Sequence, residues 1–208
     1  MEHAEASKIA LFSIADYAWN MDAYKSDASW RRAVRYLMPG HAAALQVFAS
    51  HNSDLGGNEH DFRREESEQI RPALERLLDA YCREGKREVA AASAVTEECE
   101  RMIASADLLL ASDENPALIK EITPWLMQFK LLGEYGREVL CMLAAQCDGK
   151  KTELEKAASH AKALQVLMKK IDATYNQNGF QPGVKTGSCH LKPAFDRLYQ
   201  EVVQRTGK

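Results

Sequence analysis

Residues 151–175, KTELEKAASHAKALQVLMKKIDATY, carry the most regular apolar spacing in the chain. Small or apolar side chains recur there in alternating steps of three and four residues, at Leu154, Ala157, Ala161, Leu164, Met168, Ile171 and Tyr175. Heptad spacing of this kind predicts a helix of about 37 Å that packs along a partner helix at a shallow angle. The partner must come either from elsewhere in the chain or from a second copy.

Two earlier blocks repeat this spacing. Between Lys86 and Ser112 the seam positions are Val89, Ala92, Thr96, Cys99, Ile103, Ala106 and Leu110, and after Thr123 they are Trp125, Phe129, Leu132, Gly136, Val139 and Leu143. The connections at Glu114–Asn115 and Asp148–Gly149 are short, which favours packing between neighbouring helices of one chain. The prediction is an antiparallel bundle of three long helices, with a self-associating coiled coil as the alternative.

Proline and glycine separate the helical blocks, for example at Pro39–Gly40 and Gly85. Asn115–Pro116 and Thr123–Pro124 each predict a helix start, with an N-cap residue followed by proline at the first helical position. No stretch of alternating apolar and polar residues is bounded like a strand. The predicted fold class is all-α, a helical bundle of long antiparallel helices.

The composition is that of a chain able to bury a core. Of its 208 residues 46% are hydrophobic and 27% charged, with a net charge of −3 and a pI of about 6.1. This balance argues against a basic nucleic-acid surface, and no apolar run approaches the ~20 residues of a membrane-spanning helix. Nucleic acid and membrane are therefore not expected partners.

The five cysteines do not indicate a disulfide framework. Their number is odd, no CxxC motif occurs, and four of them fall inside predicted helices: Cys82, Cys99, Cys141 and Cys147. We interpret them as small buried apolar residues. Zinc ligation is the alternative, and it lacks Cys and His pairs at ligand spacing.

The first block, residues 2–20, is apolar around the whole helical wheel. Its large apolar residues are Ile9, Leu11, Phe12, Ile14, Tyr17 and Trp19. A helix that is apolar on all sides is normally buried on all sides. We therefore expect another body to pack on this helix, with Ile9, Phe12, Tyr17 and Trp19 as the candidate contacts.

A polar, glycine-bearing segment, SHNSDLGGNEHDFRREES, spans residues 50–67. We predict a structural polar loop here, with His51, Asp54, Arg63, Arg64 and Glu66 as its principal residues. Its arginines would pair with nearby acids, and its last acids would open the next helix. Calcium binding is an alternative, although the acids do not have the EF-hand spacing. Metal-dependent hydrolysis at His51, Asp54 and Asp61 is another.

Catalytic and cofactor motifs are absent from the chain: it contains no GxSxG, GxxxxGK[ST], GxGxxG or HExxH sequence. Asp16 lies alone on the apolar first helix, and a lone carboxylate cannot perform two-carboxylate glycoside chemistry. Arg31, Arg32 and Arg35 form a small basic group that is typical of a solvated helix face. No catalytic, substrate-binding, cofactor or metal residue is predicted.

Several long segments nevertheless resemble a known family. The sequences ASKIALFSIADYAWNMDAY, HNSDLGGNEHDFRREESEQIRP, ENPALIKEITPWLMQFKLLGE and YNQNGFQPGVKTG are similar, in this order, to the post-catalytic helical region of bacterial glycoside hydrolase family 84. The resemblance runs from Met1 to about Tyr199 and is closest to Bacteroides-type enzymes. Relatives carry a tyrosine at the position of Phe62, so any hydrogen bond made by that hydroxyl is lost here.

The resemblance implies a parent enzyme that is a β-N-acetylglucosaminidase, with O-GlcNAcase activity and sometimes the label hyaluronidase. Its retaining mechanism is substrate-assisted and uses an adjacent aspartate pair in a catalytic barrel. No Asp-Asp dipeptide occurs in these 208 residues. The resemblance therefore implies a chain that is inactive alone, and it transfers no catalytic or sugar-binding residue to any position.

We therefore expect a non-catalytic helical domain that supports the barrel of such an enzyme. Residues 1–20 would be the barrel's final helix and residues 21–208 the post-catalytic bundle. The expected partner is the chain's own barrel, and the isolated chain would cover its first helix by forming a homodimer or by tilting the helix onto the bundle. The alternative is a stand-alone helical protein-interaction module. By resemblance to bacterial relatives, the parent would be exported to the periplasm or secreted.

Overall fold

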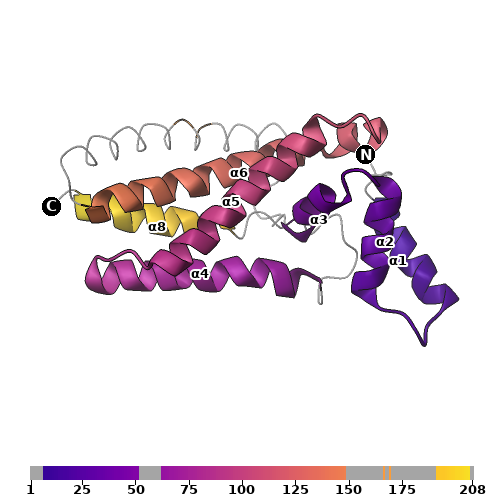
Figure 1. The fold of residues 1–208 in the computed structure, drawn as a ribbon, viewed down its shortest axis with the longest axis horizontal. Helices are drawn as coiled ribbons and strands as arrows, with labels where there is room; N and C mark the ends of the chain where they lie inside the picture. The colour runs from indigo at the N-terminus through magenta and orange to yellow at the C-terminus, as the bar shows by residue number, and fades with distance from the viewer. Residues whose placement is uncertain (1–6, 52–61, 149–165, 167–168, 170–190, 207–208) are drawn as a thin grey trace.

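The computed structural model describes residues 7–51, 62–148, 166, 169 and 191–206, and all of its regular elements there are helices (Figure 1). They are α1 (Ser7–Trp19), α2 (Ser26–Leu37), α3 (Ala42–His51), α4 (Phe62–Glu84), α5 (Val89–Leu110), α6 (Pro116–Asp148) and α8 (Leu191–Thr206). No strand occurs within these ranges. The all-α prediction is confirmed.

Helix α5 occupies the middle of the bundle. It packs most extensively against α6, and also against α3 and α4, while α8 packs against α6 and α4. The pair α1 and α2 lies at the end of the molecule away from the C-terminus (Figure 1). The core therefore forms where α5 and α6 meet, and the first two helices extend from it.

The predicted seam of α6 is confirmed. Its residues Trp125, Phe129, Leu132, Gly136, Val139 and Leu143 are all buried. The predicted N-cap at Asn115 is also present, because its Oδ1 accepts a hydrogen bond from the Leu118 amide at 3.2 Å.

The predicted helix start at Thr123–Pro124 is wrong. Both residues lie inside the continuous helix α6. Thr123 Oγ1 donates to the carbonyl of Ile119 at 2.6 Å, so its hydroxyl bonds backwards along the helix and does not cap a new one. The long buried face of α6 keeps the helix continuous despite the interior proline.

The seam predicted for α5 is correct in part. Ala92, Cys99 and Ala106 are buried, but Val89 is 67% exposed. A second stripe, displaced by one residue, is buried as well: Ala91, Val95, Glu98, Met102, Ser105 and Leu109. The buried face is wider than a coiled-coil seam because α5 has neighbours on several sides.

Close approach of α5, α6 and α8 requires glycine in α6. A Cβ on Gly136 would lie 2.5 Å from Cζ of Phe195 and 2.7 Å from Sγ of Cys99, and one on Gly133 would lie 2.9 Å from the carbonyl oxygen of Cys99. These contacts are shorter than packed atoms allow. Gly136 therefore lets the ring of Phe195 in α8 reach the core.

Polar contacts also hold α8 on the bundle. The Tyr135 hydroxyl donates to Asp196 Oδ1 at 2.7 Å, and the Phe195 ring meets the Tyr135 ring edge-on at 6.3 Å. Gln146 accepts from the Tyr81 hydroxyl at 2.5 Å and donates to the Val202 carbonyl at 3.1 Å. Helix α8 thus bridges α4 and α6.

The interpretation of the cysteines as buried residues is correct for Cys99 and wrong for Cys82, which is exposed near the end of α4. Cys141 and Cys147 are half-buried. Burial raises the pKa of Cys99 to about 12, so its thiol stays protonated and serves as packing. Cys189 lies outside the described residues.

Two other predictions fall outside the described part of the chain. They are the seam between Lys151 and Tyr175 and the second half of the Asp148–Gly149 turn. In the seam segment only Val166 and Lys169 are described, both helical, and neither is a seam position. Among the helices that are described, none has the length and apolar character needed to cross a membrane.

Candidate functional site

The most conspicuous surface feature is a group of exposed apolar residues on and next to the first helix. Four are on α1, one follows it closely, and one is in α2, and all are at least half exposed: Leu11 (60%), Ile14 (63%), Tyr17 (50%), Trp19 (92%), Met21 (65%) and Tyr36 (70%). We call these six residues the α1 face. Large exposed apolar patches on a protein usually mark sites that bind another protein or another domain.

The four residues predicted to contact another body have different environments. Trp19 is almost fully exposed, and Tyr17 is half-exposed with its ring edge-on to Tyr24 at 5.3 Å. Phe12 is half-buried, with its ring 5.1 Å from that of Tyr36. The side chain of Ile9 lies outside the described residues. The sequence analysis did not include Met21 or Tyr36 among the candidate contacts. Met21 follows α1 and Tyr36 belongs to α2, so the apolar pattern of the first helix could not indicate them.

Helix α1 is held on α2 by a salt bridge as well as by apolar contacts. Asp16 accepts a hydrogen bond from the guanidinium of Arg32, and its side chain is 33% exposed. The Ser29 hydroxyl and Arg32 together lower the pKa of the Asp16 carboxyl. Asp16 is therefore an ionised contact between α1 and α2, and Arg32 is not simply part of a solvated face.

His51, which we predicted in a polar loop, lies in the last turn of α3 and is 3% exposed. Its Nε2 is 2.5 Å from Oε1 of Glu98 in α5, and its ring stacks at a tilt on Phe129, 5.5 Å between centroids. Since an ionised carboxylate only accepts hydrogen bonds, Nε2 carries the hydrogen. His51 thus joins α3 to α5.

Arg101 completes this cluster. Burial alone would raise the pKa of Glu98, but the hydrogen bond from His51 and the Arg101 guanidinium outweigh burial and lower it. A shallow pocket of about 250 Å³ opens beside the cluster, lined by Ile70, Ala94, Glu97, Glu98 and Arg101. The pocket walls hold no hydroxyl, thiol or amine nucleophile, and the Glu98 carboxylate is already bonded to His51 and Arg101, so the cluster is suited to bridging helices.

The other residues of the predicted polar loop are only partly described. Asp54 and Asp61 lie outside the described residues. The backbone of Arg63, Arg64 and Glu66 belongs to the first turns of α4, while the positions of their side chains are not described. Within the described ranges, no group of three or more His, Cys, Asp or Glu residues is arranged to hold a metal ion.

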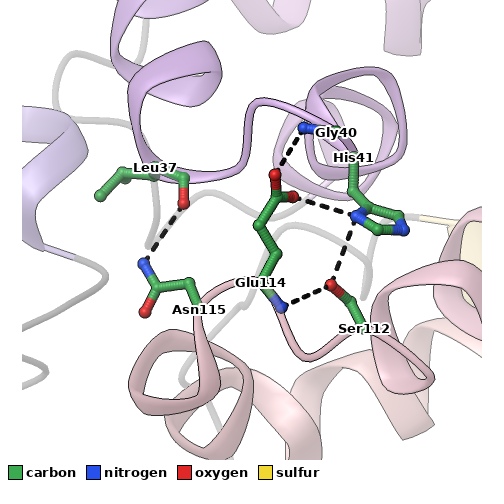
Figure 2. Close-up of polar contacts among 6 residues, drawn as sticks. All are labelled: Leu37, Gly40, His41, Ser112, Glu114 and Asn115. Atoms are coloured by element: carbon green, nitrogen blue, oxygen red, sulfur yellow. Dashed lines mark hydrogen bonds and ion pairs between the residues drawn. The ribbon is translucent and has the colours of Figure 1, made fainter.

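A second polar cluster joins the turn between α2 and α3 to the turn between α5 and α6 (Figure 2). Glu114 Oε1 accepts from the Gly40 amide at 2.6 Å, and Glu114 Oε2 lies 3.0 Å from His41 Nδ1. Ser112 Oγ is 3.3 Å from the same Nδ1. Asn115 Nδ2 donates to the Leu37 carbonyl at 3.3 Å.

The serine, histidine and glutamate of this cluster do not form a catalytic triad. In a triad the hydroxyl and the acid bond opposite nitrogens of the imidazole. Here both lie against Nδ1 of His41, so they compete for one position (Figure 2). The Gly40 amide and then His41 lower the pKa of Glu114, which keeps it an ionised acceptor. Sequence reasoning identified the Glu114–Asn115 turn but missed this cluster, because its halves are more than 70 residues apart.

Comparison with known proteins gives two family matches. The model of the bacterial GH84 post-catalytic domain matches residues 66–199. The model described as β-N-acetylglucosaminidase matches residues 1–50, the segment that contains α1, α2 and most of α3. The α1 face therefore lies within the second match.

Two solved structures are similar in fold. CpGH84D is 26% identical with a TM-score of 0.74, and the similarity covers 97% of this chain and 33% of that one. CpGH84B is 20% identical with a TM-score of 0.74, covering 93% of this chain and 31% of that one, and it shows the fold alone. The chain therefore spans about a third of the length of both.

Proposed function

Because the chain belongs to the family of bacterial GH84 post-catalytic domains, we propose that it supports the catalytic barrel of a larger β-N-acetylglucosaminidase. The observation that carries this proposal is the α1 face. Its apolar side chains are exposed in the segment that the β-N-acetylglucosaminidase model matches. A family match of this kind favours a domain of a larger enzyme over a stand-alone interaction module.

The proposed contact has a physical basis in the burial of the α1 face. Trp19, Ile14 and Leu11 expose most of their apolar surface to water, and covering it with another apolar surface is favourable. Helix α1 packs mainly on α2, which leaves its other side open to a neighbour. We assign this neighbour to the catalytic barrel because the β-N-acetylglucosaminidase model matches the segment that contains α1.

We further propose that residues 1–20 form the last helix of that barrel and residues 21–208 the bundle. In support, α1 ends at Trp19, whereas α2 contributes Trp30, Ala33, Val34 and Leu37 to the hydrophobic core. The β-N-acetylglucosaminidase match continues to residue 50, so a boundary after α3 is the competing assignment. Limited proteolysis of the larger enzyme would distinguish cleavage near residue 20 from cleavage near residue 51.

The proposed role is structural and not catalytic. The chain contains no adjacent aspartate pair, and the serine, histidine and glutamate at the α5–α6 turn have the wrong geometry for a triad. Any turnover would thus depend on residues of the barrel. The helical domain would act by burying a barrel surface that is otherwise exposed to water.

The experiment places a charge on the α1 face in the larger enzyme. With Ile14→Asp we expect the catalytic domain to lose several degrees of thermal stability, since a buried unpaired carboxylate is costly. The matched control is Leu108→Asp on α5, which is 54% exposed and does not belong to the α1 face. Equal melting temperatures for the two variants would contradict the proposal.

We also propose that the isolated chain forms a homodimer through the α1 face. The same exposed apolar groups support this arrangement, because a second copy can cover them when the barrel is absent. The catalytic barrel and a second copy of the chain could not cover the α1 face at the same time, since both would contact Trp19 and Ile14. Joining the chain to its catalytic domain should therefore abolish self-association.

A further inference from the structure

Helices α1 and α2 form an arm at one end of the molecule, which we define as residues 7–38. Helix α1 packs mainly on α2, and α2 packs on α1 and α3 (Figure 1). Helix α2 ends at Leu37, and the chain turns through Pro39 and Gly40 before α3 begins. The direction of the arm is therefore set close to this turn.

The turn is bonded to a distant part of the chain. Four polar contacts cross to the α5–α6 turn: Gly40 to Glu114, His41 to Glu114, His41 to Ser112, and Leu37 to Asn115 (Figure 2). Two of the four use the carboxylate of Glu114. This carboxylate therefore contacts the backbone at the point where the chain leaves α2.

Glu114 is itself held in place from its own side. Its amide donates to Ser112 Oγ at 3.2 Å, and the next residue, Asn115, caps α6. The side chain is 22% exposed, and that of His41 is 32% exposed. Bonds to an ionised acceptor are stronger and more directional than neutral ones, whereas apolar packing has little directional preference.

We propose that Glu114 is a latch that sets the orientation of the arm, and with it the α1 face, relative to α5 and α6. The competing explanation is that the packing of Trp30, Val34 and Leu37 sets this orientation without help from the latch. The latch does not depend on what covers the α1 face, because all of its contacts lie within this chain.

The test uses nuclear magnetic resonance of the whole 208-residue chain. Residual dipolar couplings report whether the α1–α2 amides and the α5–α6 amides share one alignment. In the unaltered chain we expect one shared alignment. In Glu114→Ala we expect the α1–α2 couplings to shrink and to need a separate alignment, and the Gly40 amide to exchange roughly tenfold faster.

Two further variants make the result specific. Glu114→Gln keeps a neutral acceptor for the Gly40 amide, so its effect should be intermediate. Asp113→Ala removes the exposed acid next to Glu114 and should leave couplings and exchange unchanged. A shared alignment with unchanged Gly40 exchange in Glu114→Ala would overturn the latch. The latch would also be overturned if Glu114→Ala disturbed α5 and α6 as much as α1 and α2.

Discussion

The carboxylate of Glu98 in α5 lies 2.5 Å from Nε2 of His51 at the end of α3, and both side chains are almost fully buried. The pair crosses between two helices that also pack through apolar contacts. Removing either partner leaves a buried polar group without its bond, and this cost exceeds the value of the bond itself.

We therefore expect His51→Ala to lower the free energy of unfolding by about 2–4 kcal/mol, from the lost bond to a charged group and the cavity left by the ring. Chemical denaturation would measure it. Glu98→Gln should also be less stable than the natural chain, because it replaces the charged partner of His51. Its matched control is Glu97→Gln, since Glu97 is an exposed neighbour on the same pocket wall. If the two glutamine variants were equally stable, the buried pair would contribute nothing.

The stability of the chain should fall in acid through Glu98. The pKa of this carboxyl is lowered from 4.5 in the folded state, so the unfolded chain binds more protons as the pH drops. Its contribution is complete above the unfolded pKa and is lost as the pH falls through the folded value. Asp16 and Glu114, whose pKa values are also lowered, act in the same direction.

The measurement is a series of denaturation curves for the natural chain and Glu98→Gln from about pH 6 to about pH 3. The difference in unfolding free energy between them should shrink steadily as the pH falls. A difference that stays constant over this range would show that Glu98 does not titrate differently in the folded and unfolded states.

Gly136→Ala should be destabilising although alanine is the better helix former. The added Cβ would lie 2.5 Å from Cζ of Phe195 and 2.7 Å from Sγ of Cys99. Overpacking of this kind costs about 1–3 kcal/mol, against a gain of about 1 kcal/mol in helix propensity. Adding Phe195→Leu should restore part of the loss in thermal melts, and a stabilised single variant would refute the close approach of α8.

The isolated chain should not hydrolyse a chromogenic N-acetylglucosaminide above the blank, since it lacks an adjacent aspartate pair. The larger enzyme, assayed beside it at equal concentration, provides the positive control. Robust hydrolysis by the 208-residue chain alone would show that its own residues are catalytic and would reject a purely supporting role.

Light scattering across a concentration series should show a dimer of the isolated chain. Ile14→Asp should shift it to a monomer, because the charge would be buried in the contact, while Leu108→Asp should not. A natural chain that remains monomeric throughout would remove the proposed self-association and leave the barrel contact untouched.

The bundle could be predicted because its determinants are local. The seam of α6, the Asn115 cap and the break at Gly85, whose φ of 64° ends α4, follow from spacing and residue type. The error at Thr123–Pro124 has a physical origin, since cap preferences describe isolated helix ends and packing can carry a helix through proline. The spacing of apolar residues does not show how many helices surround a given helix. The sequence therefore predicted one buried stripe on α5, whereas the structure buries a second one beside it.

The polar contacts were the least predictable part. His51 and Glu98 are 47 residues apart, and Gly40 and Glu114 are 74 residues apart. No local signal links such positions, and the polar composition around His51 suggested a loop where the structure has a buried helix end. By contrast, the large apolar residues of the first helix were visible in the sequence, and those that the structure leaves exposed are Leu11, Ile14, Tyr17 and Trp19.

Hydroxyl-radical footprinting of Met21 and Met127 tests the barrel contact most directly. Both methionines are exposed in this chain, at 65% and 50%, but Met21 belongs to the α1 face and Met127 lies on α6. When the chain is joined to its catalytic domain, we predict that oxidation of Met21 falls several-fold while that of Met127 is unchanged. Equal oxidation of Met21 with and without the catalytic domain would contradict the account.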